Sequence, residues 1–327
     1  MRLLVTGAAG FIGSHYVRTL LTSGFDGAEV SALTVLDKLT YAGVRENLAA
    51  VDDDPRFRFV LGDICDADLL ADVLPGHDAV VHFAAESHVD RSITGASAFV
   101  TTNVLGTQTL LQACRDAGIT TFVHISTDEV YGSIDDGSWD ETRPLEPNSP
   151  YAAAKAGSDL IALAYHRTYG MDVRVTRCSN NYGPFQFPEK VIPLFVTNLM
   201  DGLTVPLYGD GLNVREWLHV DDHCRGIHLV LSKGRPGEVY NLGGGTELTN
   251  VALTESLLDA MGAGWDSVER VADRMGHDRR YSVDIGKSRA ELGYEPLVPF
   301  DEGLAATVEW YRAHEAWWRP LKAAAAR

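Results

Sequence analysis

A glycine-rich turn near the start of the chain constrains its fold more than any other feature. Residues 2–6 form a short apolar run that predicts a buried strand, and a helical pattern follows the turn and continues through residue 21. Between them, Gly7, Gly10 and Gly13 follow a G-x-x-G-x-x-G spacing. Glycines there permit a tight turn and let the backbone approach a pyrophosphate, while the helix N-terminus offers free N–H groups. A glycine pattern alone is weak, but this order of strand, turn and helix predicts a dinucleotide-binding unit.

The first half of the chain continues as repeated strand and helix units, which predict an α/β fold with a Rossmann-type, doubly wound parallel sheet. The second predicted strand ends at Asp37, where an acidic residue accepts hydrogen bonds from a ribose diol and repels a 2′-phosphate. This favours NAD over NADP, although the positive charge of the neighbouring Lys38 weakens that preference. The predicted strands are 30–36, 57–61, 79–83, 121–126 and 173–178, and the helices are 66–74, 96–117 and 151–169.

The alternation breaks after Cys178, so we expect a second, smaller lobe. A loop at 180–184 precedes predicted helices at 191–201, 221–232, 250–261, 288–292 and 300–310, and predicted strands at 205–208 and 215–219. The alanine-rich end after Leu321 is expected to be frayed. We assign residues 1–177 and 213–246 to an NAD-binding Rossmann domain, and residues 178–212 and 247–327 to a substrate-binding α/β lobe.

The net charge and the spacing of the cysteines limit the classes of binding partner and the cellular compartment that we expect for this protein. The formal net charge is −17, which disfavours binding to nucleic acid or an anionic membrane, and no apolar run reaches membrane-spanning length. The four cysteines are far apart and the chain enters a strand directly, so we expect reduced thiols in the cytoplasm. His219 and His223 are four residues apart but lack a third ligand at convincing spacing, so no metal site is expected.

Polar residues at the end of the fifth predicted strand form the candidate catalytic group. Asp128 and Glu129 follow an apolar run, at the sheet edge where open α/β folds bind ligands. Tyr151 and Lys155 are four apart on a predicted helix and share a face, so the ammonium is expected to lower the phenol pKa and make Tyr151 a base. The alternative is that these are solvated strand-end carboxylates and an ordinary surface Tyr–Lys pair.

Taken together, these features resemble the extended short-chain dehydrogenase/reductase family, through the glycine turn, Asp37, the pair Asp63 and Ile64, and Tyr151-x-x-x-Lys155. Within it the chain resembles the dTDP-glucose 4,6-dehydratases over nearly its whole length. One departure is Met275, where that family usually has proline. The matching segments are 84–92, 126–132, 178–184, 187–190 and 276–281.

The resemblance implies an NAD-dependent lyase that oxidises carbon 4 of dTDP-glucose, expels water across carbons 5 and 6, and returns the hydride to carbon 6. The implied catalytic residues are Thr127 beside the 4-hydroxyl, Asp128 as acid, Glu129 as base at carbon 5, Tyr151 as base at the 4-hydroxyl, and Lys155. The implied NAD-binding residues are Gly7, Gly10, Phe11, Ile12, Gly13, Asp37, Lys38, Thr40, Asp63, Ile64, Phe83, Ala84, Ala85, Ser87, Thr102, Tyr151, Lys155 and Asn181.

The resemblance also implies a nucleotide-sugar site, with thymine as the base on that ground alone. Arg215 and Arg274 suit a diphosphate through charge-assisted hydrogen bonds. The implied substrate-binding residues are Ser87, Thr127, Glu129, Asn180, Lys190, Val191, Pro206, Tyr208, Arg215, Asn250, Arg274, His277 and Tyr281.

Two other functions stay open at this point. A UDP-hexose 4-epimerase or UDP-glucuronate decarboxylase uses the same scaffold, but neither reaction expels a 6-hydroxyl and so neither needs Asp128. A non-catalytic dinucleotide-sensing protein has no use for Asp128, Glu129, Tyr151 and Lys155 together. The apolar faces of the helices at 96–117 and 151–169 predict a homodimer, since in the family these helices pair across a two-fold axis.

Overall fold

The computed structural model describes residues 1–325, and its centre is a seven-stranded parallel sheet in the order β10-β6-β5-β4-β1-β2-β3. Every neighbouring pair in this sheet is parallel, so the predicted doubly wound, Rossmann-type fold is confirmed. The strands are β1 (Arg2–Thr6), β2 (Ala32–Asp37), β3 (Phe57–Leu61), β4 (Ala79–His82), β5 (Thr121–Thr127), β6 (Asp172–Cys178) and β10 (Val239–Leu242).

The central strands are buried on both faces because each face is covered by helices. Along β1, Leu3 and Val5 pack into one core with helices α1 and α8, whereas Leu4 packs into the other with α2, α5 and α6. This explains why β1 reads as a continuous apolar run rather than an alternating one. The covering helices are α1 (Phe11–Thr22) and α8 (Val220–Lys233) on one face, and α2 (Ala67–Val73), α5 (Thr107–Asp116) and α6 (Pro150–Tyr169) on the other.

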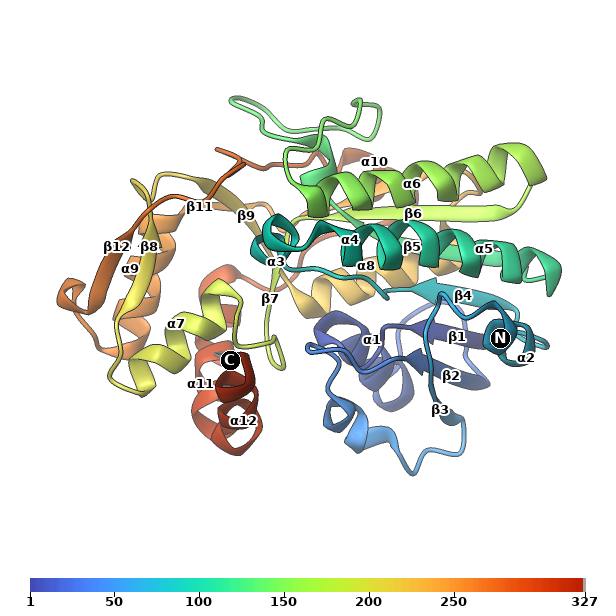
Figure 1. Cartoon of the computed structure of the whole chain (residues 1–327), viewed down its shortest axis with the longest axis horizontal. Coiled ribbons are helices and arrows are strands. Elements are labelled where there is room, and N and C mark those ends of the chain that lie inside the picture. The colour runs from blue at the N-terminus through green and yellow to red at the C-terminus, as the bar shows by residue number, and fades with distance from the viewer. Residues whose placement is uncertain (326–327) are drawn as a thin grey trace.

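A smaller lobe lies beyond the carboxyl ends of the parallel strands (Figure 1). It holds a three-stranded sheet in the order β11-β9-β7 and a parallel pair of β12 and β8. Its core is rich in aromatic side chains, including Tyr182, Trp217, Phe300 and Trp318. Its elements are β7 (Asn180–Tyr182), α7 (Val191–Met200), β8 (Val205–Tyr208), β9 (Val214–His219), β11 (Thr246–Thr249), α9 (Asn250–Met261), β12 (Val268–Val271), α11 (Phe300–Ala313) and α12 (Glu315–Ala325).

The helix predicted at 96–117 is interrupted. It consists of α4 (Ala96–Phe99), a π-helical segment η2 (Val100–Gly106) and α5, and π-helical turns are frequent at functional sites. Within η2, Asn103 is buried and its side chain both accepts from the Glu86 N–H and donates to the Glu86 carbonyl, at 2.8 and 3.0 Å. Through Asn103, this π-helical segment therefore holds the loop after β4 in place with two hydrogen bonds. The remaining short elements are η1 (Arg45–Val51), α3 (Val89–Thr94), η3 (Asp128–Tyr131), η4 (Trp265–Ser267) and α10 (Gly286–Leu292).

The structure corrects several predicted boundaries. Strand β2 starts at Ala32 rather than residue 30, and the loop predicted at 180–184 contains β7. Strands β10, β11 and β12, of four residues each, were not predicted. The expectation of a frayed end after Leu321 is wrong through residue 325, because α12 continues that far and buries Trp318. The last two residues lie outside the described part.

The assignment of residues 213–246 to the Rossmann domain stays a prediction. Helix α8 packs on β5 and β6, and β10 pairs with β6, so both accompany the large sheet. Strand β9, which falls in the same range, pairs instead with β7 and β11. Across residues 1–325, no helix is both long and apolar enough to cross a membrane.

Candidate active site

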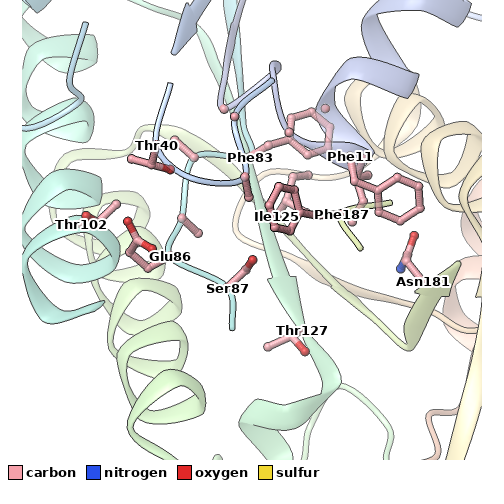
Figure 2. Close-up of a pocket in the computed structure, with 18 of the residues that line it drawn as sticks. Phe11, Thr40, Phe83, Glu86, Ser87, Thr102, Ile125, Thr127, Asn181 and Phe187 are labelled. Carbon is pink, nitrogen blue, oxygen red and sulfur yellow. The ribbon is translucent and has the colours of Figure 1, made fainter. Parts of the chain in front are cut away.

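A cavity of about 300 Å³ opens at the carboxyl ends of the parallel strands, between the large sheet and the smaller lobe. Figure 2 shows side chains converging on it from separate segments, among them Phe11, Thr40, Ser87, Thr127 and Asn181. All the residues predicted to bind NAD and all those predicted to be catalytic line this cavity. The sequence motifs are thus brought together in space, while their individual roles stay predictions.

The glycine turn leaves no room for larger residues. Gly7 has φ +70°, and a Cβ there would lie 2.5 Å from the Ala84 backbone. A Cβ at Gly13 would lie 2.7 Å from the Gly7 carbonyl oxygen. Helix α1 begins directly after Gly10, which offers no side-chain cap, so its first N–H groups remain available for a pyrophosphate.

Asp37 and Lys38, at the end of β2, both line this cavity. The Asp37 carboxylate accepts hydrogen bonds from the N–H groups of Ala9 and Leu39, both at 2.8 Å, and burial raises its pKa. The Lys38 ammonium is paired with Asp63 at 3.2 Å. Because this pairing offsets its charge, Lys38 does not counter the preference of Asp37 for NAD over NADP.

The two carboxyl groups at the end of β5 have different surroundings, and Asp128 is buried whereas Glu129 is half-buried. Asp128 is 2% exposed, and its pKa is raised well above the ordinary value by burial, then by Glu129 and Glu216. Burial also raises the pKa of Glu129, but Arg274, Arg215 and Lys190 act in the opposite direction. These environments favour a neutral Asp128 and give Glu129 compensating positive charge. The interpretation of Asp128 as a solvated carboxylate is therefore wrong.

Tyr151 and Lys155 share the inward face of α6, as predicted from their spacing. The helix starts sharply because the Ser149 hydroxyl accepts from the Ala152 N–H and Pro150 follows at the first position. The expectation that Lys155 lowers the Tyr151 pKa is wrong for this arrangement. Burial, then Glu129 and Cys178, raise the Tyr151 pKa, while the Lys155 ammonium donates to the Ile125 carbonyl at 2.6 Å.

A buried ion-pair network behind Lys155 was not found from the sequence. Asp159, one turn further along α6, is bonded to Arg177 at 2.9 Å and contacts His124 at 3.2 Å. Arg177 also donates to the Tyr131 hydroxyl at 2.8 Å. Arg177, and then the contact with His124, lower the Asp159 pKa to about 2 despite its burial. The sequence does place Asp159 on the same helix face as Lys155, four residues further on. Its partners His124 and Arg177, however, come from β5 and β6, which only the tertiary fold brings next to α6.

Three cations predicted to bind substrate act on Glu129. Lys190, Arg215 and Arg274 all lower its pKa, against the effect of burial. Lys190 donates to the Ser87 carbonyl at 2.9 Å, and Arg215 lies 4.3 Å over the Tyr281 ring. Arg274 is 3.6 Å from Asp90.

The other predicted substrate residues extend outward from these cations. Asn180 lines the cavity, and Tyr208 meets His277 edge to face with ring centroids 6.4 Å apart. Val191 begins α7, Pro206 lies in β8 and Asn250 begins α9. These three do not line the cavity, and neither do Tyr208, Arg215, Arg274, His277 and Tyr281.

Several lining residues were absent from the predicted set. Six of them belong to segments that carried the resemblance, so a signal existed for Glu86, Ser126, Cys178, Ser179, Phe187 and Glu189. Glu189 is bonded to Arg91 at 3.0 Å, which joins the small lobe to α3. The remaining unpredicted residues are Leu36, Ala42, Gly43, Gly62, Ile125 and Gln186. Among the described residues, no group of three His, Cys, Asp or Glu side chains is arranged to hold a metal ion.

Comparison with known proteins agrees with this geometry. The family model described as GDP-mannose 4,6 dehydratase matches residues 4–307. A dTDP-glucose 4,6-dehydratase of Streptomyces antibioticus is 67% identical over 98% of this chain and 96% of its own. A crystal structure of a Streptomyces venezuelae dTDP-glucose 4,6-dehydratase with NAD bound is 69% identical, with a TM-score of 0.97 over 98% of this chain and 100% of that one.

More distant structures share the fold. A UDP-glucose 4-epimerase of Thermotoga maritima is 33% identical, with a TM-score of 0.87 over 96% of this chain and 99% of that one. Fold alone therefore does not separate dehydratases from epimerases, but the high identity to the dehydratases does. The chain belongs to the nucleotide-sugar 4,6-dehydratase family, and within it to the dTDP-glucose 4,6-dehydratases.

Proposed function

We propose that this protein is an NAD-dependent lyase that converts dTDP-glucose to dTDP-4-keto-6-deoxyglucose and water. The observation that carries the proposal is the pair of a buried Asp128 and a half-buried Glu129, which lines the same cavity as Tyr151 and the glycine turn. NAD fits that cavity through the uncapped start of α1 and the Asp37 carboxylate. The relatives at 61–69% identity are dTDP-glucose 4,6-dehydratases, one of them crystallised with NAD.

Each protein group has one task in this reaction. NAD supplies the hydride acceptor at carbon 4 and returns the hydride at carbon 6. Tyr151 receives the proton of the 4-hydroxyl, and the positive charge of bound NAD opposes the effect of burial on its pKa. The 4-ketone acidifies carbon 5, so Glu129 removes that proton. Asp128, held neutral by its surroundings, protonates the departing 6-hydroxyl.

The cations around Glu129 support a nucleotide diphosphate as the remote part of the substrate. Arg215 is 6% exposed, and the Nε atom of Arg274 is buried without a hydrogen-bond partner among the described residues. A buried guanidinium N–H without a partner favours an anionic ligand, because arginine binds phosphate through charge-assisted hydrogen bonds. We assign the sugar to the acid pair and the diphosphate to these two arginines.

An epimerase or a decarboxylase does not require Asp128, since neither reaction expels a hydroxyl from carbon 6. A non-catalytic sensing protein requires none of Asp128, Glu129, Tyr151 and Lys155. Burying a carboxyl beside a second one is costly, and a purely structural role gives no compensating contact for Asp128, whose Oδ2 has no partner among the described residues. We therefore prefer the dehydratase.

We further propose a cytoplasmic homodimer. Helix α6 packs beside η2 and α5, and this surface exposes Val100, Leu105, Leu160 and Tyr169, each more than half exposed. An apolar surface over two packed helices favours pairing with a second copy. The four cysteines are free, three of them buried, in keeping with a reducing compartment.

Product analysis tests the reaction. The purified protein is incubated separately with dTDP-glucose, UDP-glucose and GDP-mannose, and products are identified by mass and NMR. We expect loss of one water from dTDP-glucose to give the 4-keto-6-deoxy sugar, with NAD copurifying and no net NADH accumulating. An epimerised product, or unchanged substrate, contradicts the proposal.

A further inference from the structure

The imidazole of His223 is a buried polar group that the proposed reaction does not use. His223 lies near the start of α8 and is 0% exposed, and its Nε2 has no hydrogen-bond partner among the described residues. Its Nδ1 lies 2.8 Å from Oδ1 of Asn181. Burying a polar ring costs stability unless its atoms are hydrogen-bonded, so this one contact requires an explanation.

The contacts of Asn181 determine which atom donates in that hydrogen bond. A backbone carbonyl can only accept, so the atom of the Asn181 amide that lies 3.0 Å from the Ser179 carbonyl oxygen must be the nitrogen. The amide oxygen therefore faces His223, and because that oxygen can only accept, the imidazole proton must be on Nδ1. Burial lowers the pKa of His223 to about 3, so the ring is neutral at neutral pH and has this one N–H to donate.

The backbone of Asn181 is held in place without His223. Asn181 lies in β7 and is paired with Leu218 of β9, and its carbonyl accepts a hydrogen bond from the Gln186 side chain at 2.8 Å. The Gln186 carbonyl in turn accepts from the Tyr311 hydroxyl of α11. The hydrogen bond from His223 therefore acts on the orientation of the Asn181 amide and not on the path of the chain.

The orientation of this amide matters because Asn181 lines the cavity, and Figure 2 shows its side chain at the cavity wall. An amide nitrogen carries two N–H groups, and the Ser179 carbonyl accepts from one of them. The second N–H is the donor that this side chain can offer to an oxygen atom of a bound dinucleotide. Turning the amide over would set oxygen against oxygen at Ser179 and N–H against N–H at His223.

We propose that His223 is a positioning residue for the cofactor: its Nδ1–H holds the oxygen of the Asn181 amide, which keeps the second amide N–H directed at bound NAD. His223 does not itself line the cavity, so it acts through Asn181. The role rests on the NAD-dependent reaction proposed above and on the predicted contact of Asn181 with the cofactor. It also connects the two lobes, because α8 packs on β5 and β6 whereas β7 belongs to the smaller sheet.

His223→Leu and His223→Asn test this role. Leucine fills a similar volume but cannot donate, whereas the asparagine amide can place an N–H close to the former position of Nδ1. The holoenzyme of each variant is mixed with excess isotopically labelled NAD, and mass spectrometry follows the exchange of the bound cofactor. This measurement needs no substrate, so it does not depend on turnover.

We expect His223→Leu to exchange NAD about 10-fold faster than the parent, which corresponds to the loss of one hydrogen bond of ordinary net strength. His223→Asn should restore exchange to within about 3-fold of the parent rate, because a donor is again present. Recovery with asparagine but not with leucine separates the hydrogen bond from the mere filling of space.

The matched control is His228→Leu on the same helix. His228 is also buried, its Nδ1 lies 3.1 Å from the Tyr16 hydroxyl, and its Nε2 likewise has no partner among the described residues. Tyr16 does not line the cavity, so the loss of this imidazole should leave NAD exchange at the parent rate. Equal exchange by His223→Leu and His228→Leu overturns the proposal.

A double-mutant cycle with Asn181→Ala tests whether His223 acts through Asn181. Adding His223→Leu to Asn181→Ala should give no further increase in exchange, and additive effects overturn the proposal. Nitrogen NMR of the parent with isotope-labelled histidine should show a neutral His223 with its proton on Nδ1, and a proton on Nε2 overturns the proposal without any variant. Failure of the proposed reaction looks different, because the parent then retains NAD but forms no 4-keto-6-deoxy product.

Discussion

At the scale of single residues, Asp128 and Glu129 are neighbours in the chain with different electrostatic surroundings. Asp128 has two nearby carboxylates and a single hydrogen bond, whereas Glu129 has three cations within range. Two carboxyls with separated proton affinities can act as acid and base in the same step. Which of the two is the acid thus depends on side chains from η3, β9 and the loop around Arg274.

Asp128→Asn should separate the first oxidation from water elimination. The variant keeps the shape and leaves Tyr151 intact, so hydride transfer from carbon 4 should persist while overall turnover falls by roughly 10²–10⁴-fold. Single-turnover absorbance should show enzyme-bound NADH accumulating with a 4-keto sugar that retains its 6-hydroxyl. Tyr151→Phe should instead slow NADH formation. An Asp128→Asn variant that turns over like the parent contradicts the assigned roles.

Asp159→Asn should destabilise the fold in a pH-dependent way. The pKa of Asp159 is lowered to about 2, so its contribution to stability is present above the ordinary value near 3.8 and is lost as pH falls toward 2. At neutral pH the variant leaves Arg177 as a buried charge without its partner carboxylate, which typically costs about 3–5 kcal/mol. Urea unfolding should show this loss at pH 7 and a shrinking difference from the parent below pH ~4.

Asp172→Asn is the matched control for that experiment. Asp172 is also paired with an arginine of β6, Arg174, at 2.7 Å, but both side chains are partly exposed. Its loss should cost at most about 1 kcal/mol, because solvent screens such a pair. Equal losses for the two variants contradict a special role for the buried network.

At the scale of elements, α6 serves two surfaces at once. Its inner face holds Tyr151, Lys155 and Asp159, all buried, and its outer face exposes Ala153, Leu160 and Ala164. Gly157 lets η2 approach closely, because a Cβ there would lie 3.3 Å from Val104. The candidate base Tyr151 and the surface proposed for dimerisation therefore lie on opposite faces of the same helix.

Leu160→Glu should prevent the proposed dimer. Leu160 is 56% exposed on the outer face of α6, where a buried carboxylate without a partner would oppose association. Light scattering should give the monomer mass for this variant and the dimer mass for the parent. Leu203→Glu is the control, since Leu203 is similarly exposed after α7, away from α6. A parent that is monomeric, or a Leu160→Glu variant that stays dimeric, contradicts the proposed surface.

At the scale of the whole molecule, the C-terminal helix α12 is connected by hydrogen bonds to the glycine turn near the N-terminus. In α12, the Trp317 indole N–H donates to the Asn47 side-chain oxygen at 2.9 Å. The Asn47 amide in turn donates to the Ala9 carbonyl at 3.0 Å, within the glycine turn. Asn47 is 2% exposed, so both bonds are shielded from water. The small lobe thereby helps to fix the turn expected to bind the pyrophosphate.

Trp317→Phe should weaken cofactor retention without abolishing the fold. The ring is kept but the N–H is lost, which leaves the buried Asn47 oxygen unpaired at a cost of about 1–3 kcal/mol. The fraction of NAD retained through gel filtration should fall relative to the parent. Trp265→Phe, at an exposed tryptophan of η4, should retain NAD normally. Identical NAD retention by the two variants would mean that the hydrogen bonds from Trp317 through Asn47 to Ala9 do not affect cofactor binding.

Local sequence patterns determined the large-scale architecture. The strand, glycine turn and helix at residues 2–21 and the repeated βα units predicted the parallel sheet, because buried strands read as apolar runs and Gly7 and Gly13 are sterically required. The same spacing rules placed Tyr151 and Lys155 on one face of α6. The residues predicted to bind NAD all line one cavity because parallel strands end at the same edge of a sheet.

Only the tertiary structure decided the electrostatics of the site and the short elements of the small lobe. Strands β10 and β12, which were not predicted, are paired with β6 and β8, and these partners are distant in the sequence. The Tyr151 pKa is raised rather than lowered, because the burial of the phenol and the position of Glu129 outweigh a lysine that bonds to Ile125. Spacing along one helix predicts which side chains are neighbours, but burial and contacts from other strands set their proton affinities.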